Sequence, residues 1–222
     1  MTIQEEVAAQ TEHWRRTQLL YNAALKEICA KIDVLNSEFV HSHRYNPIEH
    51  VTQRIKTPDS ITRKLKRIGY EPTLENMEKY LSDIAGIRII CSFTSDIRRI
   101  AALLARQDDV DVLKIKDYLK HPKENGYKSY HMLITVPVYL STGVVKVKVE
   151  IQIRTIAMDF WASLEHKIYY KFEGNAPEYI YDELKQCAMI IDQLDRKMLQ
   201  LNDAVLKLKA TSVATESDIS SV

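Results

Sequence analysis

The chain has 222 residues, of which 45% are hydrophobic and 27% charged, a composition typical of one soluble globular domain with extensions rather than of a disordered protein. Its net charge of +1 excludes a global electrostatic attraction to nucleic acid or membranes, so any basic binding surface must be local. No apolar run reaches bilayer length, the N-terminus is polar, and the three cysteines lie far apart. We therefore expect a cytoplasmic protein with free thiols.

The first segment of regular structure is helical. Apolar residues recur at helical spacing between residues 5 and 43, and no proline or glycine interrupts them. These residues are Leu20, Ala24, Ile28, Ile32, Leu35 and Phe39. The pattern predicts one long helix or two, which would form an N-terminal extension over residues 1–45.

The next segment combines a short strand with a basic helix. Residues 50–56 alternate, so Arg54 and Lys56 fall on one face, and the Thr-Pro pair that follows is typical of a helix start. The polar residues that share one face of this helix are Ser60, Lys64 and Arg67. If the strand end meets that face, the cations form a polyphosphate site. A solvated basic surface explains the segment equally well.

Asp83 stands shortly before the apolar run at residues 87–93, which predicts a buried strand. Gly86 would let the backbone approach a ligand closely, which makes Asp83 a candidate ligand-binding carboxylate. A helix or turn cap is the alternative.

The pattern of residues 95–107 then predicts a helix, and that of residues 110–118 predicts another strand.

Residues 117–154 carry the densest group of chemically functional side chains. A lysine-rich turn with two tyrosines and a histidine leads into strands predicted at 129–138, ending near Pro137, and at 145–154, with a hairpin at 141–143. In the second strand the apolar residues fall on one face, and the other face carries Glu150, Gln152 and Arg154. An acid, an amide and a cation in file can hold a metal ion and anionic substrate oxygens.

The remaining chain is predicted to be helical. Residues 155–171 form one helix, a break follows at 175–177, and the final helix carries apolar residues close to a heptad rhythm. These are Ile180, Leu184, Ile191, Leu194, Met198, Leu201, Val205 and Leu208. The stripe must pack against the N-terminal helices or a second subunit. The tail from residue 211 is expected to be disordered.

Strands mixed with helices indicate an α/β (α+β) fold with a mixed β-sheet flanked by helices.

Several phosphate and metal motifs are absent from the sequence. With 5 glycines there is no Gly-rich dinucleotide fingerprint, and no phosphate loop of the G-x-x-x-x-G-K-[ST] type, zinc spacing or G-x-S-x-G elbow occurs. Phosphates would therefore be bound by side-chain cations and a carboxylate-bound divalent metal. Asp83 and Glu150 offer the hard oxygen ligands that suit Mg²⁺.

Five spaced motifs occur in an order that closely resembles the synthetase domain of the RelA/SpoT homologues. They are HVTQRIK (50–56), DIAGIR (83–88), NGYKSYH (125–131), VEIQIRT (149–155) and FWASLEH (160–166). The resemblance covers roughly residues 15–200, and the short chain looks like a small alarmone synthetase. It implies a nucleotidyltransferase-like core at 46–174, followed by a C-terminal helix at 175–210 and the tail at 211–222.

The resemblance implies a Mg²⁺-dependent GTP pyrophosphokinase, which moves pyrophosphate from ATP to the 3′-hydroxyl of GDP or GTP and gives ppGpp or pppGpp and AMP. It assigns the metal to Asp83 and Glu150, and it gives Glu150 the activation of the 3′-hydroxyl as well. It places His131 near the phosphates of the acceptor nucleotide or near the transferred group. The residues on the ATP side are Arg54 and Arg88 around adenine, and Lys56, Lys64 and Arg67 at the phosphates. Ser60 joins them because it shares their helix face.

The residues on the acceptor side are Tyr127, which stacks on guanine, with Lys123, Lys128, Gln152, Arg154 and Asp159.

Departures from the family refine this hypothesis. Relatives with a hydrolase domain carry a His-Asp dipeptide that is absent here, so we expect synthesis only. Asp159 stands where an asparagine is expected. Its carboxylate could accept from guanine N1–H and N2–H, or it could weaken the binding of an anionic ligand. His50 replaces an aromatic residue that helps some relatives bind a regulatory alarmone.

The resemblance also implies an assembly, a homotetramer held by the terminal helices. The competing hypothesis is a regulatory module that senses an alarmone or binds single-stranded RNA, with weak or no synthesis. Asp83 and Glu150 argue against RNA, because paired carboxylates repel its phosphates.

Overall fold

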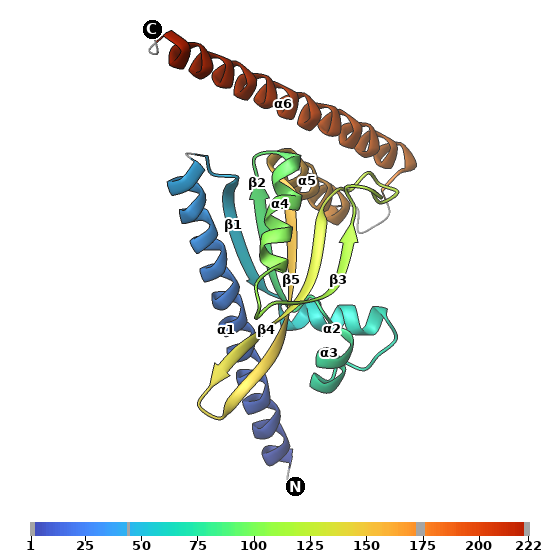
Figure 1. The fold of residues 1–222 in the computed structure, drawn as a ribbon. Helices are drawn as coiled ribbons and strands as arrows, with labels where there is room; N and C mark the ends of the chain where they lie inside the picture. The colour runs from blue at the N-terminus through green and yellow to red at the C-terminus, as the bar shows by residue number, and fades with distance from the viewer. Residues whose placement is uncertain (1–2, 44, 172–175, 220–222) are drawn as a thin grey trace.

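The computed structural model describes residues 3–43, 45–171 and 176–219 (Figure 1). The elements in chain order are α1 (Ile3–His43), β1 (Ile48–Ile55), α2 (Pro58–Arg67), α3 (Leu74–Tyr80), β2 (Ala85–Cys91), α4 (Thr94–Ala105), β3 (Asp111–Asp117), β4 (Tyr130–Leu140), β5 (Gly143–Thr155), α5 (Ile156–Lys171) and α6 (Glu178–Ile219). The N-terminal segment is thus one helix, not two. The predicted boundary at residue 174 and the end of the tail at 220–222 lie outside the described residues.

The five strands form one mixed sheet in the order β1-β2-β5-β4-β3. β2 and β5 run parallel, whereas β1/β2, β4/β5 and β3/β4 are antiparallel. The predicted mixed sheet and the predicted hairpin between β4 and β5 are therefore confirmed. The parallel pair matters most for the site, because it places Gly86 opposite Glu150 and Arg88 opposite Gln152.

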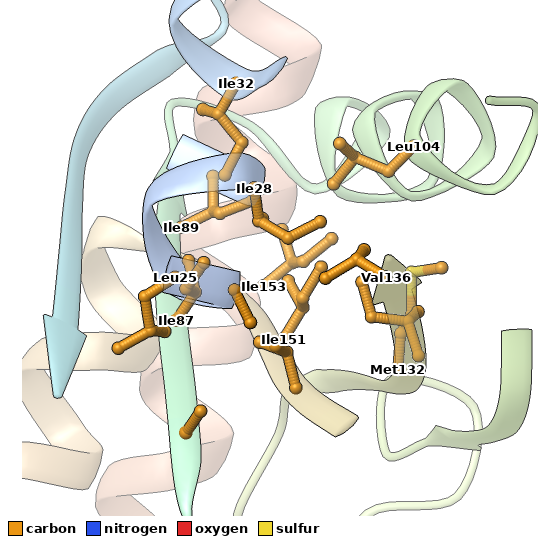
Figure 2. Close-up of a cluster of buried hydrophobic side chains, with 14 of the residues drawn as sticks. Leu25, Ile28, Ile32, Ile87, Ile89, Leu104, Met132, Val136, Ile151 and Ile153 are labelled. Atoms are coloured by element: carbon orange, nitrogen blue, oxygen red, sulfur yellow. The ribbon is translucent and has the colours of Figure 1, made fainter. Parts of the chain in front are cut away.

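The hydrophobic core lies between the sheet and helices α1 and α4, which cover one face (Figure 1). Leu25, Ile28 and Ile32 of α1 point toward the apolar residues of β2 and β5, such as Ile89 and Ile151 (Figure 2). The alternation predicted for β5 is confirmed, since its apolar side chains from Val147 to Ile153 are buried and contribute to this core. Each fully buried aliphatic side chain contributes about 1.5–3 kcal/mol to folding.

The opposite face of β1, β2 and β5 carries the polar side chains. Arg54, Arg88, Glu150 and Gln152 are only partly buried there or exposed, because α2 and α5 flank this face without covering its centre. One amphipathic sheet thus separates a structural face, which stabilises the fold, from a face that is free to bind a ligand.

Three parts of the chain differ from the sequence-based expectation. The short helix α3, capped by the Thr73 side chain, was not predicted. β4 continues to Leu140 although it contains Pro137. β3 pairs with β4 only as far as Thr135, so beyond that residue one edge of β4 is unpaired. A proline, which has no backbone N–H, is tolerated at such an edge. α6 continues to Ile219 rather than ending near residue 210, since no glycine or proline interrupts it.

α6 packs against α5 and α4 and crosses one end of the molecule at an angle to α1, rather than packing along it (Figure 1). Within the described residues, no helix is both long and apolar enough to span a bilayer.

Candidate functional site

Three adjoining cavities run across the polar face of the sheet. We call them together the site trough. Its cation end, about 350 Å³, is lined by Lys56, Ser60, Arg63, Lys64, Arg67 and Asp83. Its carboxylate centre, about 200 Å³, includes Arg54, Asp83, Gly86, Arg88, Glu150 and Gln152. Its aromatic end, about 400 Å³, includes Arg54, Arg88, Tyr127, Gln152 and Arg154. Neighbouring cavities share lining residues: Asp83 lines the first two, and Arg54, Arg88 and Gln152 line the second and the third.

The cation end is formed where β1 ends and α2 begins. Thr57 caps α2 through its side chain, which accepts from the Ser60 backbone N–H, and Pro58 occupies the first turn as predicted. Lys56 meets Lys64 and Arg67 at this end as predicted. Arg54 was expected to join them but lines the other two cavities instead. The carboxylate of Asp83 is the acidic group among these cations.

Asp83 lies just before β2 and is clamped by two lysines. Its Oδ2 is 2.5 Å from Lys56 Nζ and 2.7 Å from Lys64 Nζ. Burial alone would raise the pKa of Asp83, but the hydrogen bonds and charges of the two lysines outweigh it and lower the pKa. The carboxyl group is therefore ionised at neutral pH.

Glu150 on β5 lies beside Asp83 in the carboxylate centre. Its Oε1 is 3.5 Å from His131 Nδ1, and its Oε2 accepts a hydrogen bond of 3.0 Å from Gln152 Nε2. Burial and the charge of Asp83 raise the pKa of Glu150, while His131 and Gln152 lower it, with lowering as the net result. The centre therefore holds two ionised carboxylates, one on β5 and one in the segment just before β2.

These residues fit a divalent cation. Asp83 Oδ1 is buried and has no hydrogen-bond partner within the described part of the chain, which leaves one carboxylate oxygen available. Asp83 and Glu150 line the same cavity and provide the oxygen donors that Mg²⁺ prefers.

A chain of polar contacts connects the aromatic end to Glu150. Arg154 Nη2 donates to the Tyr127 hydroxyl at 2.6 Å, and the hydroxyl lies 2.8 Å from His131 Nε2. The other ring nitrogen of His131, Nδ1, lies 3.5 Å from Glu150 Oε1. A second path runs through Gln152, which accepts from Arg154 at 3.2 Å. The two paths orient Glu150 from both of its oxygens.

Asp159 on α5 bridges two arginines rather than standing free. Its Oδ1 is 3.2 Å from Arg88 Nη1 and 3.0 Å from Arg154 Nη1. The Arg154 side chain is only 6% exposed, so its charge requires such a partner. Burial and the neighbouring Arg154 lower the pKa of Arg88. Asp159 thus holds together arginines that the resemblance places on opposite substrate sides.

The two lysines assigned to the acceptor side are placed differently from each other. The Lys123 ammonium lies 4.7 Å from the centre of the Tyr127 ring and therefore stays near the aromatic end. Lys128 instead forms an ion pair with Asp192 of α6 and lines cavities outside the site trough.

Sequence reasoning missed two residues. Arg63 lines the cation end, and its position three residues after Ser60 is a helical spacing that could have revealed it. Asp192 carried no local signal, because its partner Lys128 is remote in sequence.

The chain is similar to known proteins of one family. The sequence profile of the family described as "Region found in RelA / SpoT proteins" matches residues 53–175. The chain is 46% identical to the GTP pyrophosphokinase YwaC of Bacillus subtilis over 205 residues, covering 92% of this chain and 98% of that protein.

Two solved structures are also similar. The crystal structure of small alarmone synthetase 2 from Bacillus subtilis gives a TM-score of 0.78 at 46% identity and covers 86% of this chain and 98% of its own. That of small alarmone synthetase 1 from Bacillus subtilis, bound to its product pppGpp, gives 0.81 at 35% identity, with 88% and 99% covered. With motifs, sheet and whole-chain similarity in agreement, the chain belongs to the RelA/SpoT family and is built like the small alarmone synthetases.

Proposed function

We propose that this protein is a GTP pyrophosphokinase of the small alarmone synthetase type. It would transfer the pyrophosphoryl group of ATP to the 3′-hydroxyl of GDP or GTP, giving ppGpp or pppGpp and AMP. The observation that carries this proposal is the site trough itself, in which a cluster of cations and an aromatic subsite flank two ionised carboxylates. Similarity to a GTP pyrophosphokinase and to a synthetase bound to pppGpp supports it.

The 3′-oxygen of the acceptor attacks the β-phosphorus of ATP and forms a new bond to it. The bond between the β-phosphorus and the oxygen that bridges to the α-phosphorus breaks, so AMP leaves with that oxygen. The proton of the 3′-hydroxyl is released to water. Transfer of this kind depends on positioning and on neutralising charge. Lys56, Lys64 and Arg67 at the cation end are suited to bind the ATP phosphates, and Arg54 and Arg88 to hold the adenine.

Mg²⁺ would be held by Asp83 and Glu150, and when bound it supplies positive charge next to the transferred phosphates. The lysines that clamp Asp83 Oδ2 are the same groups that face the ATP phosphates. Nucleotide phosphates would attract Lys56 and Lys64 away from Asp83 and free the second carboxylate oxygen. The clamp would thus hold the carboxylate ionised until the nucleotide arrives.

Glu150 would accept the hydrogen bond of the acceptor hydroxyl. Its lowered pKa makes it a weak proton acceptor, so its main contributions are orientation and metal binding. Tyr127 would stack on the guanine at the aromatic end, where Arg154 and His131 fix its hydroxyl.

The direct test is incubation of the purified protein with ATP, Mg²⁺ and GDP or GTP, followed by anion exchange. A tetra- or pentaphosphate peak with a matching amount of AMP is expected. Asp83→Asn and Glu150→Gln should each reduce synthesis by about 10²-fold or more, as for lost charge-stabilising groups. Asp203→Asn, an exposed site on α6, is the control and should be unaffected.

The outcomes separate the hypotheses. Synthesis retained in either carboxylate variant at normal Mg²⁺ would contradict the site assignment. No turnover by the wild type, even with pppGpp added as an activator, would favour the alarmone-sensing or RNA-binding module instead.

We also propose that the protein assembles as a homotetramer through its terminal helices. The support is the apolar stripe of α6, in which Leu194, Met198, Leu201, Val205 and Leu208 are all exposed in the single chain. Residues at heptad spacing on one helix need an apolar partner.

A further inference from the structure

The loop between β3 and β4, residues 118–129, carries Tyr127 and lies beside the first part of α6 (Figure 1). We call it the acceptor loop. Its contact with α6 is close: a Cβ placed on Gly126 would lie 2.5 Å from the Cβ of Ala188. Gly126 also has a φ of +88°, which favours glycine. The loop backbone can therefore reach α6 only because residue 126 has no side chain.

An ion pair lies two residues further along the loop. Lys128 Nζ binds Asp192 Oδ1 on α6, and both side chains are about four-fifths buried. Arg196 Nη2 contacts the other carboxylate oxygen at 2.6 Å, so Asp192 is held in place on the helix. An ion pair in such a setting is costly to break, because removal of one partner leaves the other as a poorly hydrated charge.

Tyr127 stands between these two contacts. Its ring packs against the small apolar cluster of Trp161, Ala162 and Ala188, while its hydroxyl reaches Arg154 in the site trough. α6 is in turn fixed to α5, since Trp161 Nε1 donates to the carbonyl of Leu184 at 2.9 Å. The direction of the Tyr127 ring thus depends on how α6 is seated.

We propose that Asp192 is a positioning residue for the acceptor nucleotide. It anchors Lys128, and together with the Gly126–Ala188 contact it holds the acceptor loop in the conformation that presents Tyr127. Lys128 is then an anchor of the loop and not a ligand of the acceptor phosphates. The inference rests on the proposed function, because it assigns the guanine to Tyr127.

The test compares Asp192→Asn, Lys128→Met and the double variant in steady-state assays. Each single change should raise the KM for GDP about tenfold, as expected when a close charge pair that orders a binding element is lost. The KM for ATP should stay within about twofold, because the cation end lies on other elements. The double variant should be no worse than either single one. Asp203→Asn, further along α6, is the matched control.

Binding of a fluorescent GDP analogue provides a readout without catalysis and should weaken by the same factor. The charge exchange Lys128→Asp with Asp192→Lys, made together with Arg196→Gln so that the new lysine does not face Arg196, should restore much of the acceptor affinity, since an anchor needs only opposite charges.

The opposite results would overturn the inference. Two results would show that Lys128 binds the acceptor directly and that Asp192 competes for it. In the first, Asp192→Asn lowers the KM for GDP. In the second, the charge exchange abolishes acceptor binding, and the effects of the two single changes on the KM for GDP are additive in the double variant. An unchanged KM in an active Asp192→Asn enzyme also rejects the anchor. Absence of product from the wild type would instead refute the proposed function.

Discussion

At the scale of single residues, the hydroxyl and the ring of Tyr127 have separable roles. The ring lines the aromatic end, whereas the hydroxyl joins Arg154 to His131. Tyr127→Ala should raise the KM for GDP and GTP by about tenfold or more, because stacking on a base contributes ~1–3 kcal/mol. Tyr127→Phe should keep most acceptor affinity and lower kcat instead. Steady-state kinetics with each substrate varied in turn measures both, and an unchanged KM in Tyr127→Ala contradicts the assignment.

The clamped carboxylate of Asp83 gives a second residue-scale prediction. Its pKa is lowered in the folded protein, so its stabilising contribution is complete above the unfolded pKa of about 3.9 and is lost as the pH falls through the folded value. Asp83→Asn should lower the unfolding free energy by ~2 kcal/mol at neutral pH, since Lys56 and Lys64 lose their shared partner. The difference from wild type should shrink below about pH 4.

Urea unfolding of both proteins across this pH range is the measurement. A difference that stays constant down to about pH 2 would show that the clamp does not contribute. The comparison with the variant is needed because burial raises the pKa of other acids, Asp96 and Asp195, whose contributions have the opposite sign.

Residue spacing predicted much of the candidate site but not its long-range pairs. The shared polar face of α2 and the polar row of β5 could be predicted from the sequence, because each lies within one element of known period. The bridge from Asp159 to Arg88 and the pair of Lys128 with Asp192 join elements remote in sequence. Those contacts depend on how α5 and α6 are packed, which local periodicity does not determine.

At the scale of elements, α1 stabilises the sheet from the face opposite the site trough. Ile28 is fully buried between α1 and the sheet, so Ile28→Ala should lower the unfolding free energy by about 2–5 kcal/mol. The KM values should remain unchanged at 25 °C, because the core and the trough are on different faces. Val34→Ala on the exposed side of α1 is the control, with an effect within about 0.5 kcal/mol.

Thermal or urea unfolding checks this prediction, together with kinetics on the same samples. An Ile28→Ala protein of wild-type stability would mean that α1 is not seated on the sheet as described.

The elements themselves were mostly predictable from sequence. α1, α2, α4 and the strand β5 have clear periods, and α2 also has a clear cap. α5 was predicted from the unbroken stretch between β5 and the break at residues 175–177. α3 was missed because it has only 7 residues and a single buried side chain, too short for a period to show. The far part of β4 was missed because Pro137 ends most strands, and only the pairing partner reveals that this edge is open.

At the scale of the whole molecule, the exposed stripe of α6 predicts association. Leu201 is 51% exposed in the single chain and lies in the middle of the stripe. Leu201→Glu should shift the protein from a tetramer to smaller species, because a buried charge opposes an apolar interface. Gln200→Glu, the exposed neighbour, adds the same charge off the stripe and should leave the assembly intact.

Size-exclusion chromatography with light scattering gives the mass of each variant. An unchanged mass for Leu201→Glu would remove α6 from the interface. A wild type that is monomeric at micromolar concentration would contradict the assembly altogether.

The parallel pairing of β2 and β5 also has a consequence for synthesis of the chain on the ribosome. β5 is the last strand to be made, yet it lies in the middle of the sheet and carries Glu150. A nascent chain that has reached only β4 already contains Lys56, Lys64 and Asp83, but it can neither close the sheet nor oppose Gly86 with Glu150. Pairing across so long a stretch is slow and comes late in folding. The incomplete polypeptide therefore contains the groups suited to bind a nucleotide but not the full catalytic centre, and turnover of ATP must wait for translation to pass residue 155 and release β5.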